Sequence, residues 1–142
     1  MKKRSTSRRA VVLVDHGSRE AAANRQLTAV AAALRRRLPG WRVATAHLSV
    51  APPGVPAAIA ACVAAGAREI VVMPYFLGPG RHASRDVPQL AREARARHPR
   101  VRIRVAAALG VHAGIVATVA ERVRGAARPR RAARSASRTR SR

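Results

Sequence analysis

The chain is poor in cysteine, in aromatic residues and in acids, and each shortage excludes a class of protein. Cys62 is the only cysteine among 142 residues, so neither an internal disulfide nor a thiolate metal cluster can form. The three aromatic residues, Trp41, Tyr75 and Phe76, offer too little π surface for the stacking platforms that bind single-stranded nucleic acid. Only five apolar residues follow the basic N-terminus, too few for a signal-peptide core or a membrane span, so we expect a cytoplasmic protein.

Acids are scarce, and the positive charge is concentrated towards the two ends of the chain. Six acids face 29 lysines and arginines, which gives a net charge of +23. Residues 1–9 and 125–142 hold twelve of these cations and no acid. We predict a disordered basic arm at 1–9, one α/β domain at 10–124 and a disordered arginine-rich tail at 125–142. Nonspecific contact between the tail and polyanions is the interaction that this charge favours.

Within residues 10–124, apolar strand-like runs alternate with segments of helical period. The strands are predicted at 10–14, 42–49, 69–73 and 101–105, with helices after each of them. In the last helix, Ile115, Val116, Val119 and Val123 are expected to pack inward. Strands that alternate with helices imply right-handed crossovers and a parallel sheet covered on both faces. We therefore predict a three-layer α/β sandwich with a four-stranded parallel sheet in the order 2-1-3-4.

Two histidines stand where such a sheet places its ligands. His16 follows the first predicted strand, and His82 follows the third strand and its loop. Open parallel sheets bind ligands beyond the carboxyl ends of the strands, where the strand order reverses, so this order would bring both imidazoles together. Imidazole nitrogen binds iron, cobalt, nickel and zinc. The alternative is that each histidine only forms a hydrogen bond within a turn.

Five motifs resemble those of the small sirohydrochlorin chelatases of the CbiX and SirB type, over roughly residues 10–124. They are Asp15-His-Gly-Ser-Arg, Ala46-His-Leu, Pro74-Tyr-Phe-Leu-Gly-Pro-Gly-Arg-His, Arg85-Asp-Val-Pro and Leu109-Gly-Val-His. The resemblance implies insertion of Co²⁺ or Fe²⁺ into sirohydrochlorin, in cobalamin or siroheme biosynthesis, without nucleotide hydrolysis and without an organic cofactor. It also implies that His16 and His82 bind the metal or accept pyrrole protons, and that a chain this short forms a homodimer.

The resemblance fails at the place of the family's first glutamate, where this chain has Ser49. A second glutamate position falls on Pro52. A serine hydroxyl neither offsets metal charge nor carries protons as a carboxylate does. His47 is the candidate replacement, as a third metal ligand or as the base, because it precedes Ser49 by two residues and shares its face of the strand. Filling the edge of the sheet is the alternative role for His47.

The substrate implied by the resemblance carries eight carboxylates, and four residues near the histidines suit it. Arg19 and Arg81 are placed to pair with carboxylates, Ser18 offers a donor, and Gly80 lets the loop approach a flat macrocycle. Three functions remain open at this point: an active chelatase, a homologue that binds metal or tetrapyrrole without turnover, and a protein that associates with polyanions through its basic tails.

Overall fold

The computed structural model describes residues 7–129, which divide into two units, one ending at Val111 and one beginning at His112. The first unit has the alternation that the sequence predicts. Its elements are β1 (Arg9–Asp15), α1 (Ala21–Arg37), β2 (Trp41–His47), α2 (Val55–Ala64), β3 (Glu69–Pro74), the π-helical turn η1 (His82–Asp86), α3 (Val87–Arg97) and β4 (Arg102–Val105). Of the basic arm predicted at 1–9, residues 1–6 lie outside the described residues, and Arg9 belongs to β1 and not to a disordered arm.

The four strands form one parallel sheet in the order β2-β1-β3-β4, which confirms the predicted topology. β1 is therefore paired on both sides, with β2 and with β3. Its residues 10–14 are buried, as a strand covered on both faces must be. The carboxyl ends of β1 and β3 lie side by side, and this edge of the sheet carries the two histidines.

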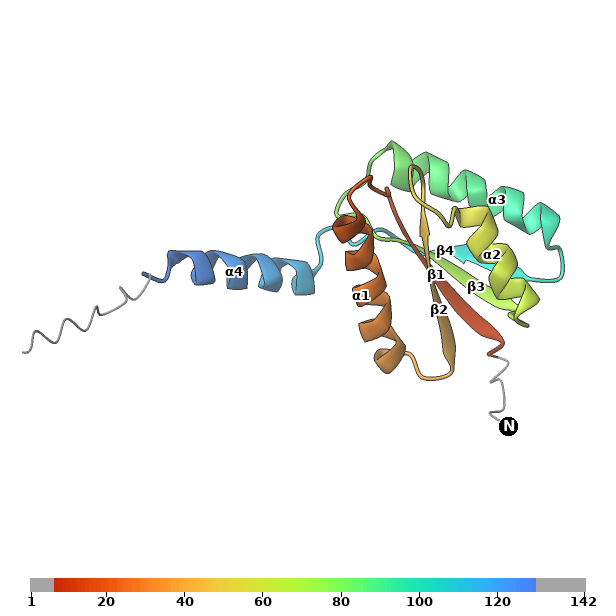
Figure 1. The fold of residues 1–142 in the computed structure, drawn as a ribbon, viewed down its shortest axis with the longest axis horizontal. Coiled ribbons are helices and arrows are strands. Elements are labelled where there is room, and N and C mark those ends of the chain that lie inside the picture. Colours follow the sequence, from red (N-terminus) through yellow and green to blue (C-terminus); the bar gives the residue numbers. More distant parts are fainter. Residues whose placement is uncertain (1–6, 130–142) are drawn as a thin grey trace, which may run out of the picture. The chain divides into compact units, whose positions relative to one another are not determined.

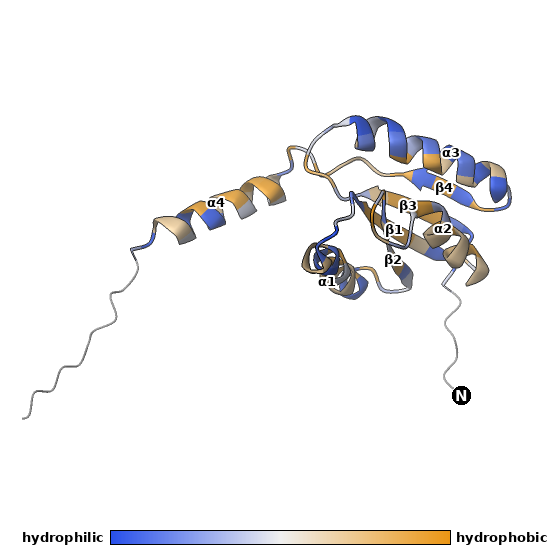
Figure 2. Ribbon diagram, turned by 45° about the horizontal axis from the view of Figure 1, so that its top comes forward, coloured by the Kyte–Doolittle hydropathy of each residue, from blue (hydrophilic) through white to orange (hydrophobic). Residues whose placement is uncertain are grey.

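Helices cover both faces of the sheet, giving three layers (Figure 1). On one face, Leu27 and Ala31 of α1 pack against Val11 and Leu13 of β1. On the other face, the apolar sides of α2 and α3 pack against the same sheet, and Ile59 is fully buried there. Figure 2 shows mainly hydrophobic residues in the strands and many hydrophilic ones along α3.

The second unit is the helix α4 (Ala113–Ala127), which begins after His112. It extends to Ala127, three residues into the segment that the sequence assigned to the tail, and residues 130–142 lie outside the described part. Taken by itself, this unit buries none of its helical residues, and the inward packing of this helix stays a prediction. Val116, Val119 and Val123 are more than half exposed, and their spacing places them on one face.

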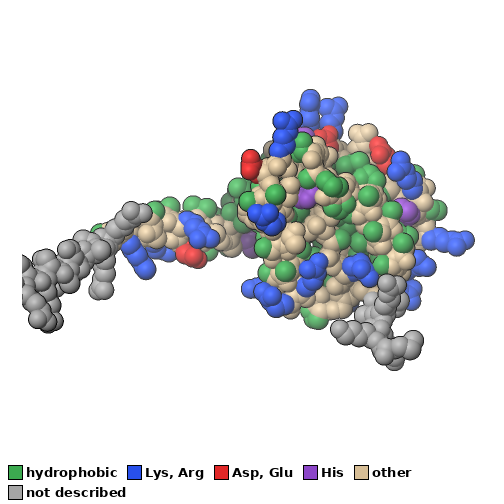
Figure 3. Space-filling view, in the orientation of Figure 1, with side chains coloured by type: hydrophobic (Ala, Val, Ile, Leu, Met, Phe, Trp, Pro, Cys, Tyr) green, Lys and Arg blue, Asp and Glu red, His purple; other side chains and the backbone are tan. Residues whose placement is uncertain are grey.

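Among the described residues, no helix is both long enough and apolar enough to cross a membrane. Figure 3 shows arginine side chains spread over the visible face of the first unit, with few acids between them.

Candidate active site

His16 and His82 lie together beyond the carboxyl ends of β1 and β3. The centroids of their rings are 4.8 Å apart, and the ring planes meet at 77°, edge to face. His16 immediately follows the last residue of β1, and His82 is the first residue of η1. Both side chains are exposed. The expected adjacency of the two imidazoles is confirmed, and both remain accessible to an approaching ion.

A carboxylate orients the ring of His82. Asp86 stands four residues later in η1, and its Oδ2 lies 2.6 Å from Nδ1 of His82. A carboxylate only accepts, so Nδ1 carries the proton and donates it to this hydrogen bond. The lone pair on Nε2 is then free. Histidines that ligate metals are held in this way by a partner on their other nitrogen.

The loop that carries His16 is held by a buried pair of side chains. Asp15 Oδ1 accepts hydrogen bonds from His47 Nδ1 at 2.5 Å and from the Gly17 backbone N–H at 3.0 Å. His47 is only 6% exposed. The His47 ring thus supports Asp15, which in turn fixes the turn directly after His16.

The described residues contain no group of three or more histidine, cysteine or acidic side chains placed to hold a metal ion. A third-ligand role for His47 beside His16 and His82 therefore finds no support. The histidine pair supplies two nitrogen ligands, and the remaining positions around an ion stay open to other groups.

Gly17 is required by the geometry of this turn. Its φ is +82°, and a Cβ there would lie 2.0 Å from the carbonyl oxygen of Ser49. The same contact shows how tightly the loop after β2 packs against the loop after β1. Ser49 donates to the His16 carbonyl oxygen from its backbone N–H at 3.1 Å and from its hydroxyl at 3.2 Å. Ser49 thus lies beside His16.

Ser18 and Asn24 tie the same loop to the start of α1. The Ser18 backbone N–H donates to Asn24 Oδ1 at 2.9 Å, and Asn24 Nδ2 donates to the Ser18 carbonyl oxygen at 2.7 Å. The Ser18 hydroxyl accepts from the Glu20 N–H at 3.0 Å. Ser18 therefore serves the loop itself, and a role as a substrate donor stays a prediction.

A hollow of about 280 Å³ lies beside His82. Ser49, His82, Asp86 and Glu93 line it, together with Leu48, Gln89 and Leu90. Glu93 lies two helical turns after Asp86 and accepts a hydrogen bond from Gln89 at 3.3 Å. A second hollow, of about 230 Å³, adjoins Asp15 and His16. Half of the six acids of this chain thus line the two hollows beside the histidines.

Residues 77–81, the loop before His82, are exposed to solvent. Arg81 is exposed, as is Arg19 near the other histidine. A Cβ at Gly78 or Gly80 would meet no atom within 4 Å, and neither residue has a positive φ. The backbone conformation therefore does not require glycine at these positions. The lack of a side chain at Gly78 and Gly80, beside the guanidinium of Arg81, suits the close approach of a flat anionic ligand.

Three site residues were missed by sequence reasoning: Asp86, Asn24 and Glu93. Asp86 had a signal, because it follows His82 by four residues and such a spacing brings side chains together on a helix. The prediction treated residues 74–82 as a loop and so did not use that spacing. Asn24 bonds to Ser18 six residues before it, and Glu93 lies on α3, which continues directly from η1.

Comparison with known proteins identifies the family to which the chain is similar. The CbiX family profile matches residues 10–126. The chain is 33% identical over 113 residues to the chloroplastic sirohydrochlorin ferrochelatase of Arabidopsis thaliana, covering 80% of this chain and 50% of that protein. It is 35% identical over 81 residues to the sirohydrochlorin cobaltochelatase of Methanococcus maripaludis, covering 57% of this chain and 56% of that protein.

Among solved structures, the chain resembles the sirohydrochlorin chelatase SirB from Bacillus subtilis subspecies spizizenii in complex with cobalt. The TM-score is 0.78 at 27% identity, over 83% of this chain and 50% of that one. The chain spans about half the length of the curated relatives that it matches.

Proposed function

Because the chain belongs to the CbiX family, we propose that it inserts a divalent metal ion, Co²⁺ or Fe²⁺, into sirohydrochlorin. The observation that carries this proposal is the exposed histidine pair at the carboxyl ends of β1 and β3, with ring centroids 4.8 Å apart. We place this reaction in cobalamin or siroheme biosynthesis, in the cytoplasm.

The metal is a substrate in this reaction and binds first to the two imidazoles. His82 offers Nε2, because Asp86 holds its Nδ1–H. His16 approaches edge to face and supplies the second nitrogen. Two ligands hold an ion loosely enough to pass it on, since the remaining positions are open to the pyrrole nitrogens.

Insertion of M²⁺ replaces two pyrrole protons, which must leave the macrocycle. As the pyrrole nitrogens take the ion, each imidazole that releases it regains a lone pair and accepts one proton. The charge balances, because one divalent ion enters while two protons leave. His47 contributes by positioning, since its ring is buried against Asp15 and supports the His16 turn.

Cationic groups beside the histidines hold the substrate. Arg19 and Arg81 pair with peripheral carboxylates, and the bare backbone at Gly80 lets the macrocycle lie close to His82. Ser18 donates to a carboxylate through its hydroxyl.

A second copy of the chain completes the site as a homodimer. Within the described residues, His16 and His82 provide only two nitrogen ligands, so other groups must complete the surroundings of the ion. The apolar face of α4, with Val116, Val119 and Val123, supplies the surface that a partner copy would cover. Sedimentation equilibrium on Val119→Asp against the unchanged chain tests this assembly; a monomer in both would contradict it.

Absorbance-followed insertion of Co²⁺ and Fe²⁺ into sirohydrochlorin, without oxygen, tests the function. The intact chain is compared with His16→Ala, His82→Ala and a reaction without protein, because cobalt also inserts spontaneously. His98→Ala is the matched control, since His98 caps the end of α3. We expect insertion above background that both site variants lose and the control keeps.

A homologue without turnover is the second candidate, favoured by the serine at position 49. It predicts that sirohydrochlorin binds to the intact chain while insertion stays at the background rate. Failure of both binding and insertion would overturn both proposals.

A further inference from the structure

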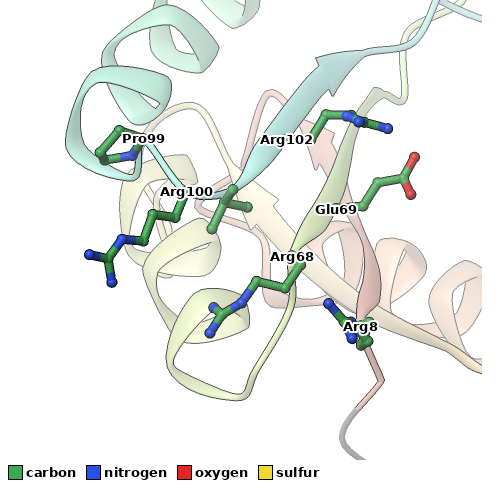
Figure 4. Close-up of a pocket in the computed structure, with 7 residues that line it drawn as sticks. Arg8, Arg68, Glu69, Pro99, Arg100 and Arg102 are labelled. Carbon is green, nitrogen blue, oxygen red and sulfur yellow. The ribbon is translucent and has the colours of Figure 1, made fainter.

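A larger hollow lies at the opposite end of the sheet from the histidines. Its volume is about 470 Å³, within the range of roughly 300–1,000 Å³ that small-molecule sites occupy. Arg8, Arg68 and Arg100 line it just before β1, β3 and β4, and Glu69 and Arg102 line it from the first residues of β3 and β4. The hollow is therefore built from the amino ends of three adjacent strands (Figure 4).

The backbone that carries these arginines is fixed by the sheet. The Arg68 N–H donates to the Arg8 carbonyl oxygen at 2.8 Å, and the Arg102 N–H donates to the Arg68 carbonyl oxygen at 2.9 Å. The attachment points of Arg8 and Arg68 thus stand on neighbouring strands, about 4.8 Å apart, and Arg100 precedes β4 by two residues. An anion that enters the hollow meets cations whose backbone is already ordered.

Glu69 is the single acid that lines this hollow, and its side chain extends away from Arg68 and Arg100. Glu69 is paired in register with Arg9 of β1 and with Arg102 of β4, so the three side chains form one row across the sheet. In Figure 4, the side chains of Glu69 and Arg102 extend to one side, and those of Arg68 and Arg100 to the other. Glu69 therefore offsets the charge of its row and leaves that of Arg68 and Arg100 uncompensated.

Among the described residues, the ion pairs join histidines to aspartates, and none includes an arginine of this hollow. Guanidinium groups that line one hollow repel one another, and a bound anion reduces that repulsion. The planar fork of a guanidinium fits two oxygens of a phosphate at once. The chemistry of the hollow is thus that of a receptor for a compact, multiply charged anion.

We propose that this hollow binds a ligand through one or two phosphate groups, with Arg68 and Arg100 as its principal donors and Arg8 as a third. The site is separate from the histidine pair, because the two lie at opposite ends of the same strands. The proposal does not depend on chelatase activity. Free pyrophosphate and a phosphorylated metabolite present the same groups to it.

Calorimetric titration of the full chain with pyrophosphate, at constant ionic strength, tests the site. The double variant Arg68→Gln/Arg100→Gln is compared with Arg25→Gln/Arg92→Gln, which removes the same charge from exposed positions of α1 and α3. All three proteins keep the same terminal segments, so any binding there is common to them. We expect saturable binding in the intact chain and in the control, and roughly a tenfold or greater loss of affinity in the first variant.

Two outcomes would overturn the proposal. One is equal pyrophosphate affinity in the two double variants, since binding would then follow net charge alone. The other is citrate binding as tightly as pyrophosphate, which would assign the hollow to polycarboxylates. Thermal unfolding without ligand shows whether each variant is folded, and Arg100→Lys, which keeps the charge but loses the fork, gives an intermediate affinity if the proposal holds.

Discussion

Replacing Gly17 with alanine tests how the loop after β1 is built. Gly17 has φ +82°, a conformation that costs an L-residue about 1–2 kcal/mol. The new Cβ would also stand 2.0 Å from the Ser49 carbonyl oxygen and 3.0 Å from the His47 Cβ. Since Cβ atoms essentially never approach another atom closer than 3.0 Å, the two loops must separate by about 1 Å.

Forcing packed groups apart costs typically about 1–3 kcal/mol, so Gly17→Ala should lower the free energy of unfolding by about 2–5 kcal/mol in total. Gly40→Ala is the matched control, because Gly40 has φ +80° but a Cβ there meets no atom within 4 Å. The control should lose only about 1–2 kcal/mol. Urea unfolding followed by circular dichroism measures both.

The same substitution should weaken metal binding. The Ser49 N–H donates to the His16 carbonyl oxygen, so separating the loops moves His16 away from His82. Titration with Co²⁺, followed by its visible absorption, should show weaker binding in Gly17→Ala and unchanged binding in Gly40→Ala. Equal destabilisation by the two substitutions, with unchanged Co²⁺ affinity in both, would refute this account of the loop.

Three further predictions concern single side chains. Asp86→Asn should reduce Co²⁺ affinity about 10- to 100-fold, because the amide holds the His82 ring less firmly than the carboxylate does; an unchanged titration would contradict this. Glu93→Gln should raise the KM for Co²⁺ roughly two- to five-fold and leave the KM for sirohydrochlorin unchanged, since its carboxylate lines the hollow beside His82; an equal rise in both would point to a structural defect. Burial raises the pKa of the Cys62 thiol, against a smaller lowering by Arg42, so maleimide should label it slowly at pH 8 in the folded chain and fast in urea. The thiol's contribution to stability is complete below its unfolded pKa and is lost as the pH rises through the higher folded pKa, so unfolding in urea should become easier at alkaline pH, and Cys62→Ser should flatten that dependence.

The fold follows from patterns that are local in the sequence. Buried strands such as residues 10–14 carry continuous apolar runs, and α1 carries its apolar residues at helical spacing, so the alternation is visible without a structure. Parallel crossovers then restrict the order of the strands. The adjacency of His16 and His82 follows directly, because both stand at the carboxyl ends of neighbouring strands.

Contacts between side chains on different loops were not predictable in this way. The pairing of His47 with Asp15 depends on the register of β2 against β1, which places these two residues opposite each other. The sequence suggested a metal ligand or a base at His47, and in the structure its ring is buried and bonded to Asp15. For α4, the helical period predicts which residues share an apolar face. It does not predict which surface covers that face.

The neighbouring positions of β1 and β3 also determine when this protein can acquire metal during its folding. His16 and His82 are 66 positions apart in the sequence, and β2 and α2 lie between the two strands that pair to bring them together. Contacts between such distant segments form slowly, because closing a long loop costs conformational entropy. A nascent chain that ends before β3 therefore presents His16 alone, and the capacity to hold an ion arises in one step, when the third strand joins the sheet.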